Sequence, residues 1–178
     1  MKHGRLESGY EVFTPPESAY DSIKVRNKLW GKAGPRPLQA KNPPYEPMAS
    51  ERAAWRFPAH AWLEEILIRF PGRVVLAFMP AHIAAQPVPG SKDAAKENEC
   101  KARIAALARR YGALPVIDFR IRSEITSNDQ NYWDQLHYRL PIADRVARGI
   151  ERAIATGKHD PNGDWQLIDA PSMNAAAH

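Results

Sequence analysis

Two short apolar runs limit what this chain can fold into. Residues 74–79 read Val-Val-Leu-Ala-Phe-Met and residues 116–119 read Val-Ile-Asp-Phe, and both are short and rich in branched or aromatic side chains. Such runs are typical of strands buried on both faces of a parallel sheet. Apolar residues recur at helical spacing around them, over about residues 58–70, 91–111 and 141–156. This alternation predicts an α/β domain over residues 58–157, with right-handed crossovers between parallel strands.

Residues 1–57 are a different kind of segment. They hold seven of the 16 prolines, and proline removes a backbone donor and restricts the residue before it. We therefore expect a Pro-rich irregular arm with one brief helix at about residues 22–29, which turns Ile23, Leu29 and Trp30 inward. The arm either wraps another part of the molecule or is a flexible leader. Residues 158–178 are expected to form a tail.

The composition fits a globular chain without a targeting signal. A length of 178 residues with 44% hydrophobic and 25% charged residues suits one domain, and a single cysteine excludes an intramolecular disulfide. No apolar run reaches the ~18 residues of a membrane span, and no signal-peptide core follows the first residues. We expect a cytoplasmic location by default, or the cell envelope if an N-terminal segment is missing. The net charge of +5 is spread along the chain, which indicates a solvated surface and not specific nucleic-acid binding.

The strongest chemical signal is an aspartate three residues before a histidine, Asp134 and His137, between the last predicted strand and the last predicted helix. A short turn can bring the carboxylate against one ring nitrogen of His137 and leave the other nitrogen free to accept a proton. The pattern therefore predicts an orienting acid and a general base. The plainer interpretation is two polar residues at a helix entrance, with Asp134 accepting hydrogen bonds from loop amides.

The run YWDQLHYRLPIADRVARGI, which starts at Tyr132, resembles the C-terminal block of the SGNH (GDSL-type) hydrolases. In that family an aspartate and a histidine three residues apart precede the terminal helix. The resemblance covers residues 59–156 and implies that Asp134 is the triad acid and His137 the base that activates a serine. It also implies a flavodoxin-like three-layer αβα fold, with a parallel sheet and helices on both faces. The implied activity is hydrolysis of esters or acyl transfer, with an O-acylated saccharide as one substrate by analogy.

Other parts of the family pattern are absent from the sequence. It has no Gly-Asp-Ser block and no Gly-x-Asn-Asp block; Ser8 is the nearest candidate nucleophile, and Ser127-Asn128-Asp129 comes too late in the chain. We therefore expect the C-terminal half of a longer protein. The open sheet edge would pair with residues 10–13, with residues 165–168, with a second copy of the chain or with the missing N-terminal half. The alternatives are a non-catalytic interaction module of the same fold and, with less support, a basic anion-binding protein.

Further residues have a functional and a plainer interpretation. His82 is predicted to line the substrate cleft or else to cap a turn or face solvent, and Arg139 to bind an anionic substrate or else to form a surface ion pair. Asp118 is predicted to be a buried, hydrogen-bonded carboxylate, and Cys100 to be part of the core. The histidines show no metal-ligand spacing and no Gly-rich phosphate loop occurs, so we expect neither metal nor cofactor.

Overall fold

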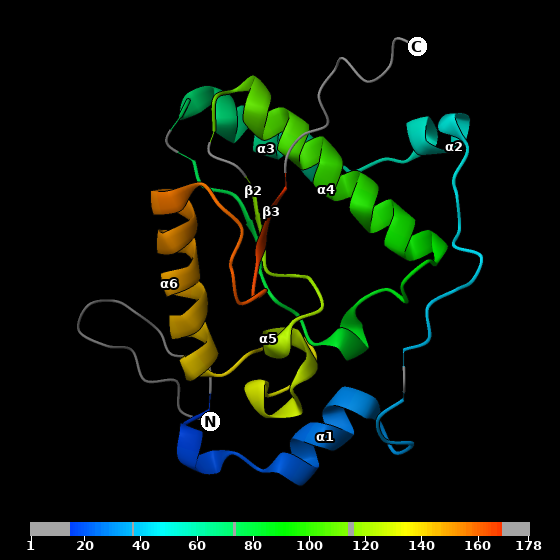
Figure 1. Ribbon diagram of the computed structural model, residues 1–178, viewed down its shortest axis with the longest axis vertical. Coiled ribbons are helices and arrows are strands. Elements are labelled where there is room, and N and C mark those ends of the chain that lie inside the picture. Colours follow the sequence, from blue (N-terminus) through cyan, green and yellow to red (C-terminus); the bar gives the residue numbers. More distant parts are fainter. Residues whose placement is uncertain (1–14, 37, 73, 114–115, 169–178) are drawn as a thin grey trace.

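The structure is a computed structural model that describes residues 15–36, 38–72, 74–113 and 116–168 (Figure 1). Its sheet has the strand order β1-β2-β3, with β1 (Ala77–Phe78), β2 (Val116–Asp118) and β3 (Gln166–Ile168). The first two strands are parallel, with Ala77 opposite Ile117, as the sequence predicts. The third is antiparallel, with Leu167 opposite Ile117, so the expectation of an entirely parallel sheet is wrong. One of the segments expected at the sheet edge, residues 165–168, does supply a strand.

Helices make up most of the regular structure. The helices are α1 (Ser22–Trp30), α2 (Ala49–Ala54), α3 (Ala59–Arg69), α4 (Lys92–Arg110), α5 (Glu124–Ser127) and α6 (Leu140–Thr156), with 3-10 turns η1 (Glu17–Ala19), η2 (Ile83–Ala85) and η3 (Asp129–Asn131). The four longer helices that the sequence predicts are confirmed as α1, α3, α4 and α6. Ser91 fixes the start of α4, since its hydroxyl accepts a hydrogen bond from the amide of Ala94. Gly157 ends α6 with a φ of 60°, a conformation that glycine adopts easily.

The core lies on both faces of the sheet. On one face, Val146 of α6 packs with Ile117. On the other face, Ala108 of α4 packs with Val116. Successive strand residues point to opposite faces, so Val116 packs against α4 and Ile117 packs against α6. Accordingly, α4 and α6 lie on either side of the strands in Figure 1.

The arm wraps the domain to which it belongs. Helix α1 buries Val25 and Leu29 against Tyr132. Farther along, the amide of Lys41 donates to the carbonyl of Pro89 at 2.8 Å, which holds the arm against the loop after η2. Wrapping is therefore confirmed for the described part of the arm. The prediction for Ile23 is wrong, because its side chain is 72% exposed while Val25 is buried in its place.

Helix α3 presents apolar side chains to solvent. Leu67 is buried, whereas Trp62, Ile66 and Phe70 are exposed. Trp62 and Ile66 are four residues apart and lie on one face of the helix, and Phe70 is the residue that ends it. We call these three side chains the α3 surface. Separately, β1 is an edge strand, and its outer edge pairs with no other described residue. The described part of the domain therefore has two unpartnered features, the α3 surface and the free edge of β1.

Candidate functional site

The loop that holds Asp134 and His137 is closed by a β-bridge between Tyr132 and Tyr138. Inside it, Oδ1 of Asp134 accepts hydrogen bonds from the amides of Leu136 at 2.9 Å and His137 at 3.0 Å. The same carboxylate contacts Nδ1 of His137, with Oδ2 at 2.8 Å. The predicted contact between the carboxylate and one ring nitrogen is therefore present, and backbone amides hold the carboxylate in place.

This contact fixes how the imidazole of His137 can act. A carboxylate only accepts hydrogen bonds, so Nδ1 carries the proton and the lone pair of the neutral ring lies on Nε2. Nε2 makes no hydrogen bond with any residue that the structure describes, and the side chain is 69% exposed. Partial burial acts to raise the pKa of Asp134, but hydrogen bonds from the Leu136 amide and from His137 outweigh it and lower the pKa. The pair thus combines an ionised carboxylate with an accessible proton acceptor.

The loop is tied to the rest of the domain through Gln135. Its carbonyl accepts the amide of His82 at 2.9 Å, and its side-chain amide donates to the carbonyl of Leu29 at 2.8 Å. His82 follows β1, while Gln135 belongs to the segment after β2. Both segments therefore meet at the carboxyl end of the two parallel strands, the edge where ligands bind in open α/β sheets.

No described hydroxyl or thiol contacts Nε2 of His137. The hydroxyls of Ser91 and Ser123 cap α4 and α5, and Ser8 lies outside the described residues. Cys100 is half-buried with its sulfur 3.5 Å from Nε2 of His60. Burial raises the pKa of this thiol, which opposes formation of a nucleophilic thiolate.

His82 is a buried, hydrogen-bonded residue of the fold and has no exposed surface with which to line a substrate cleft. Its exposed fraction is 0%, its Nε2 lies 3.1 Å from Oδ1 of Asp129, and its Nδ1 accepts the amide of Ala84. Because Nδ1 accepts, the ring is neutral with its proton on Nε2, which donates a hydrogen bond to Asp129. Burial lowers the pKa of His82 in spite of the nearby Asp129 carboxylate. The capping interpretation is therefore confirmed, since His82 caps η2.

Arg139 has protein partners for most of its donors. Its guanidinium donates to the carboxylate of Glu17, with Nε at 2.7 Å, and to the carbonyl of Gln130 at 2.9 Å. It also lies over the ring of Tyr20, 4.1 Å from the centroid. Arg139 thus fastens the arm to the loop before α6, which agrees with the ion-pair interpretation.

A buried ion pair lies at the end of β2, and the sequence predicted half of it. Asp118 is 1% exposed, as expected of a buried carboxylate, and Lys101 donates to its Oδ2 at 2.9 Å. The lysine also donates to the carbonyl of Arg120 and pairs with Glu97. The burial of Lys101 could have been predicted from its position on α4, because it lies four residues before the buried Ala105 and therefore on the same helix face.

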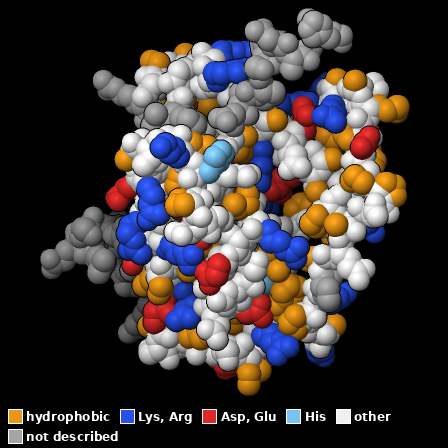
Figure 2. All heavy atoms as spheres, in the orientation of Figure 1, with side chains coloured by type: hydrophobic (Ala, Val, Ile, Leu, Met, Phe, Trp, Pro, Cys, Tyr) orange, Lys and Arg blue, Asp and Glu red, His pale blue; other side chains and the backbone are white. Residues whose placement is uncertain are grey.

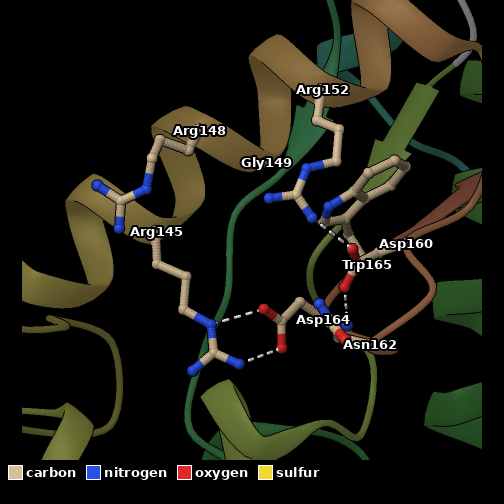
Figure 3. Close-up of a pocket in the computed structure, with 8 residues that line it drawn as sticks. All are labelled: Arg145, Arg148, Gly149, Arg152, Asp160, Asn162, Asp164 and Trp165. Carbon is tan, nitrogen blue, oxygen red and sulfur yellow. Dashed lines mark hydrogen bonds and ion pairs between the residues drawn. The ribbon is translucent and has the colours of Figure 1, made fainter.

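Ion pairs also line a hollow of about 350 Å³ beside α6 (Figure 3). Both carboxylate oxygens of Asp164 accept from Arg145 at 2.6 Å, and Asp160 accepts from Arg152 at 3.1 Å. These pairs run back along α6 from its last turn toward its middle. They hold the segment after α6 against that helix, and this segment returns to the carboxyl end of β2 before the antiparallel β3 begins.

Comparison of the chain with protein-family models, curated protein sequences and solved structures gives no match. Within the described ranges, no cluster of three or more His, Cys, Asp or Glu side chains is arranged to hold a metal ion. No helix in the same ranges has both the length and the apolar character needed to cross a membrane. The geometry of the Asp134 and His137 pair therefore carries the functional argument.

Proposed function

We propose that Asp134 and His137 supply the acid and base of an SGNH-type serine hydrolase or acyl-transfer site that acts on esters. His137 is the general base, and Asp134 orients it. The observation that carries the proposal is the contact of the Asp134 carboxylate with Nδ1 of His137, at 2.8 Å, which leaves Nε2 accessible. The serine comes from outside the described residues, either from Ser8 or from a further polypeptide segment.

The finer fold that we propose is a three-layer αβα sheet with further strands beside β1. Helices α4 and α6 already cover opposite faces of the three strands. The free edge of β1 and the α3 surface would both be covered by such strands and their helices. A serine at the carboxyl end of a strand added there would lie on the same rim as His137.

The proposal is tested by hydrolysis of p-nitrophenyl acetate at pH 8 by the purified chain and its variants. His137→Ala should reduce the rate to that of buffer, because the base is lost. Asp134→Asn should reduce it by at least about tenfold while the imidazole remains, because a positioned base contributes about 10²–10⁴-fold. A fluorophosphonate probe, followed by mass spectrometry, should label a serine in the wild type and not in His137→Ala.

His60→Ala is the matched control, since it removes another partly exposed imidazole, one that contacts Cys100 and not a carboxylate. Its rate should equal that of the wild type. An equal loss in His60→Ala and His137→Ala would mean that free imidazoles carry the reaction. A wild-type rate no higher than buffer would mean that this chain alone has no working hydrolase site. That result would favour the second candidate function, a non-catalytic interaction module.

The second candidate is a non-catalytic interaction module, favoured by the exposure of Trp62, Ile66 and Phe70 and by the free strand edge of β1. Exposed apolar patches of this kind mark interaction sites. Sedimentation of the wild type and of Trp62→Glu tests whether a second copy binds there. A dimer that dissociates in Trp62→Glu, but not in the control Leu136→Glu at another exposed apolar side chain, would support self-association.

A further inference from the structure

A second hollow lies at the carboxyl end of β2, and no residue of the Asp134 and His137 loop lines it. Its volume is about 520 Å³, within the range of small-molecule sites. It is bounded by the segment after η2, by α4, by the residues after β2 and by β3. In Figure 2 the molecule is hollowed below α4, and acidic and basic side chains meet at this hollow. We call it the α4 cleft.

The charges that line the α4 cleft leave one positive charge in excess. Three cationic side chains line it, Lys101, Arg120 and Arg122, together with two carboxylates, Glu97 and Asp118. Both carboxylates already pair with Lys101, at 3.2 and 2.9 Å. The excess charge therefore belongs to the two arginines, and a single anionic group would balance it.

Arg120 has a buried donor, Nε, that makes no hydrogen bond with the described residues. The carboxylate oxygen of Glu97 lies 3.4 Å from this atom as an ion pair. A buried donor of this kind is costly and is normally satisfied by protein, water or ligand. Arg122 is exposed at the rim and, unlike Arg120, makes no ion pair within the described ranges. Both arginines thus have donors available to an oxyanion.

Part of the lining is apolar. Pro87, Pro89 and Ile121 contribute to this part. The arm holds one segment of it in place, because Lys41 donates to the carbonyl of Pro89 and Tyr45 donates to the carbonyl of Gly90 at 2.8 Å. A segment held in this way is formed before any ligand arrives, which lowers the entropic cost of binding.

We propose that the α4 cleft binds a small alkyl carboxylate. The carboxylate lies between Arg120 and Arg122, whose planar donors match a carboxylate geometry. The alkyl chain lies against Pro87, Pro89 and Ile121. This proposal does not depend on the hydrolase proposal, since it uses none of the residues of the Asp134 and His137 loop.

The test is a titration of ¹⁵N-labelled protein with octanoate below its micelle concentration, followed by amide chemical shifts. Saturable shifts should be confined to residues 86–90, 97–102 and 118–122. Arg122→Ala should weaken octanoate binding by about tenfold, the effect of losing a charge-assisted hydrogen bond. Ala102→Leu should weaken it similarly by filling the cleft, without a change in charge. Acetate and 1-hexanol should each bind at least about tenfold more weakly, because each lacks one half of the interaction.

Arg148→Ala is the matched control. It removes one exposed arginine that lines the hollow beside α6, and it changes the net charge by the same amount as Arg122→Ala. Its octanoate affinity should equal that of the wild type. Equal weakening in Arg148→Ala and Arg122→Ala, or shifts spread over the whole surface, would reduce the effect to general charge attraction and overturn the proposal. Inorganic phosphate that competes as well as octanoate would overturn the assignment of an alkyl carboxylate. Circular dichroism of each variant verifies that it is folded.

Discussion

Nε2 of His82 donates a hydrogen bond to Oδ1 of Asp129 at 3.1 Å, although 47 positions separate the two residues. The bond joins the segment after β1 to the segment after β2. Asp129 also accepts from the indole of Trp30 at 2.9 Å, so the arm is part of the same network. The carboxyl end of the sheet, where the Asp134 and His137 loop lies, is thus held by a partly buried polar network that includes neither Asp134 nor His137.

Replacing His82 should lower the stability of the fold. His82→Ala removes a fully buried ring and leaves the amide of Ala84 and one bond of Asp129 without a partner. We expect the free energy of unfolding to fall by about 2–4 kcal/mol, measured by urea denaturation at pH 7.5. His60→Ala, at a partly exposed ring, should cost less. A loss no greater in His82→Ala than in His60→Ala would contradict a structural role for the Asp129 bond.

The same ring predicts how stability depends on pH. Burial lowers the pKa of His82 below its ordinary 6.5, and the Asp129 carboxylate offsets this only in part. The unfolded chain therefore takes up a proton near pH 6.5 that the folded protein takes up at lower pH, so stability is full above that pH and falls below it. Burial gives His60 a shift of the same sign.

Urea denaturation of the wild type and of His82→Gln at pH 7.5, 6.5 and 5.5 measures this dependence. The wild type should lose more stability than His82→Gln over this range. NMR titration of the His82 ring is the direct measurement. A pKa at or above 6.5 in the folded protein would contradict the prediction.

The sequence was most informative where structure is local. Helices α3, α4 and α6 and the contact between Asp134 and His137 follow from spacing over a few residues, whereas the parallel pairing of β1 and β2 was predicted from the helix that lies between the two strands. Periodicity did not tell which side of α3 is buried, because Trp62, Ile66 and Phe70 satisfy the pattern and yet face solvent. Nothing in an apolar pattern distinguishes a face that meets the core from one that meets a partner or water.

The parts that were missed depend on residues far apart in the chain. The segment that leads to the antiparallel β3 is held to α6 by the pairing of Arg145 and Arg152 with Asp164 and Asp160. Asp129 was considered only as part of a possible asparagine block, whereas its partner His82 precedes it by 47 residues. Such pairings carry no spacing signal, since any exposed Asp or Arg satisfies the local pattern equally well.

The buried pair of Lys101 and Asp118 should show strong energetic coupling. Lys101→Met leaves the Asp118 carboxylate buried without its cation, which should cost about 3–5 kcal/mol. Lys101→Met combined with Asp118→Leu should cost less than the two single changes together, because no uncompensated charge remains. Lys24→Met is the control at the exposed pair with Asp21, where solvent screens the charges and the loss should be much smaller. Additive effects in the urea denaturation cycle would argue against coupling.

Gly149 is needed for close packing between α6 and the core. A Cβ at this position would lie 2.8 Å from two ring carbons of Phe119 and 3.1 Å from Trp165. Gly149→Ala should therefore destabilise the protein by about 1–3 kcal/mol, although helix propensity alone would stabilise it by about 1 kcal/mol. Adding Phe119→Leu should recover part of the loss. Thermal unfolding measures both variants, and a higher melting temperature for Gly149→Ala would show that the contact has room to relax.

The protonation of His137 tests the proposed base without any need for a substrate. Contact with the Asp134 carboxylate requires the proton on Nδ1 of the neutral ring. In His159, by contrast, Nδ1 accepts the amide of Leu167 at 3.1 Å, so the proton lies on Nε2. Long-range ¹H–¹⁵N spectra at pH 8 should therefore show opposite tautomers for the two rings. In Asp134→Ala, His137 should lose its preference for Nδ1 while His159 stays unchanged. A proton on Nε2 of His137 in the wild type would occupy the position that must accept the proton of a serine, and His137 would then not be the base.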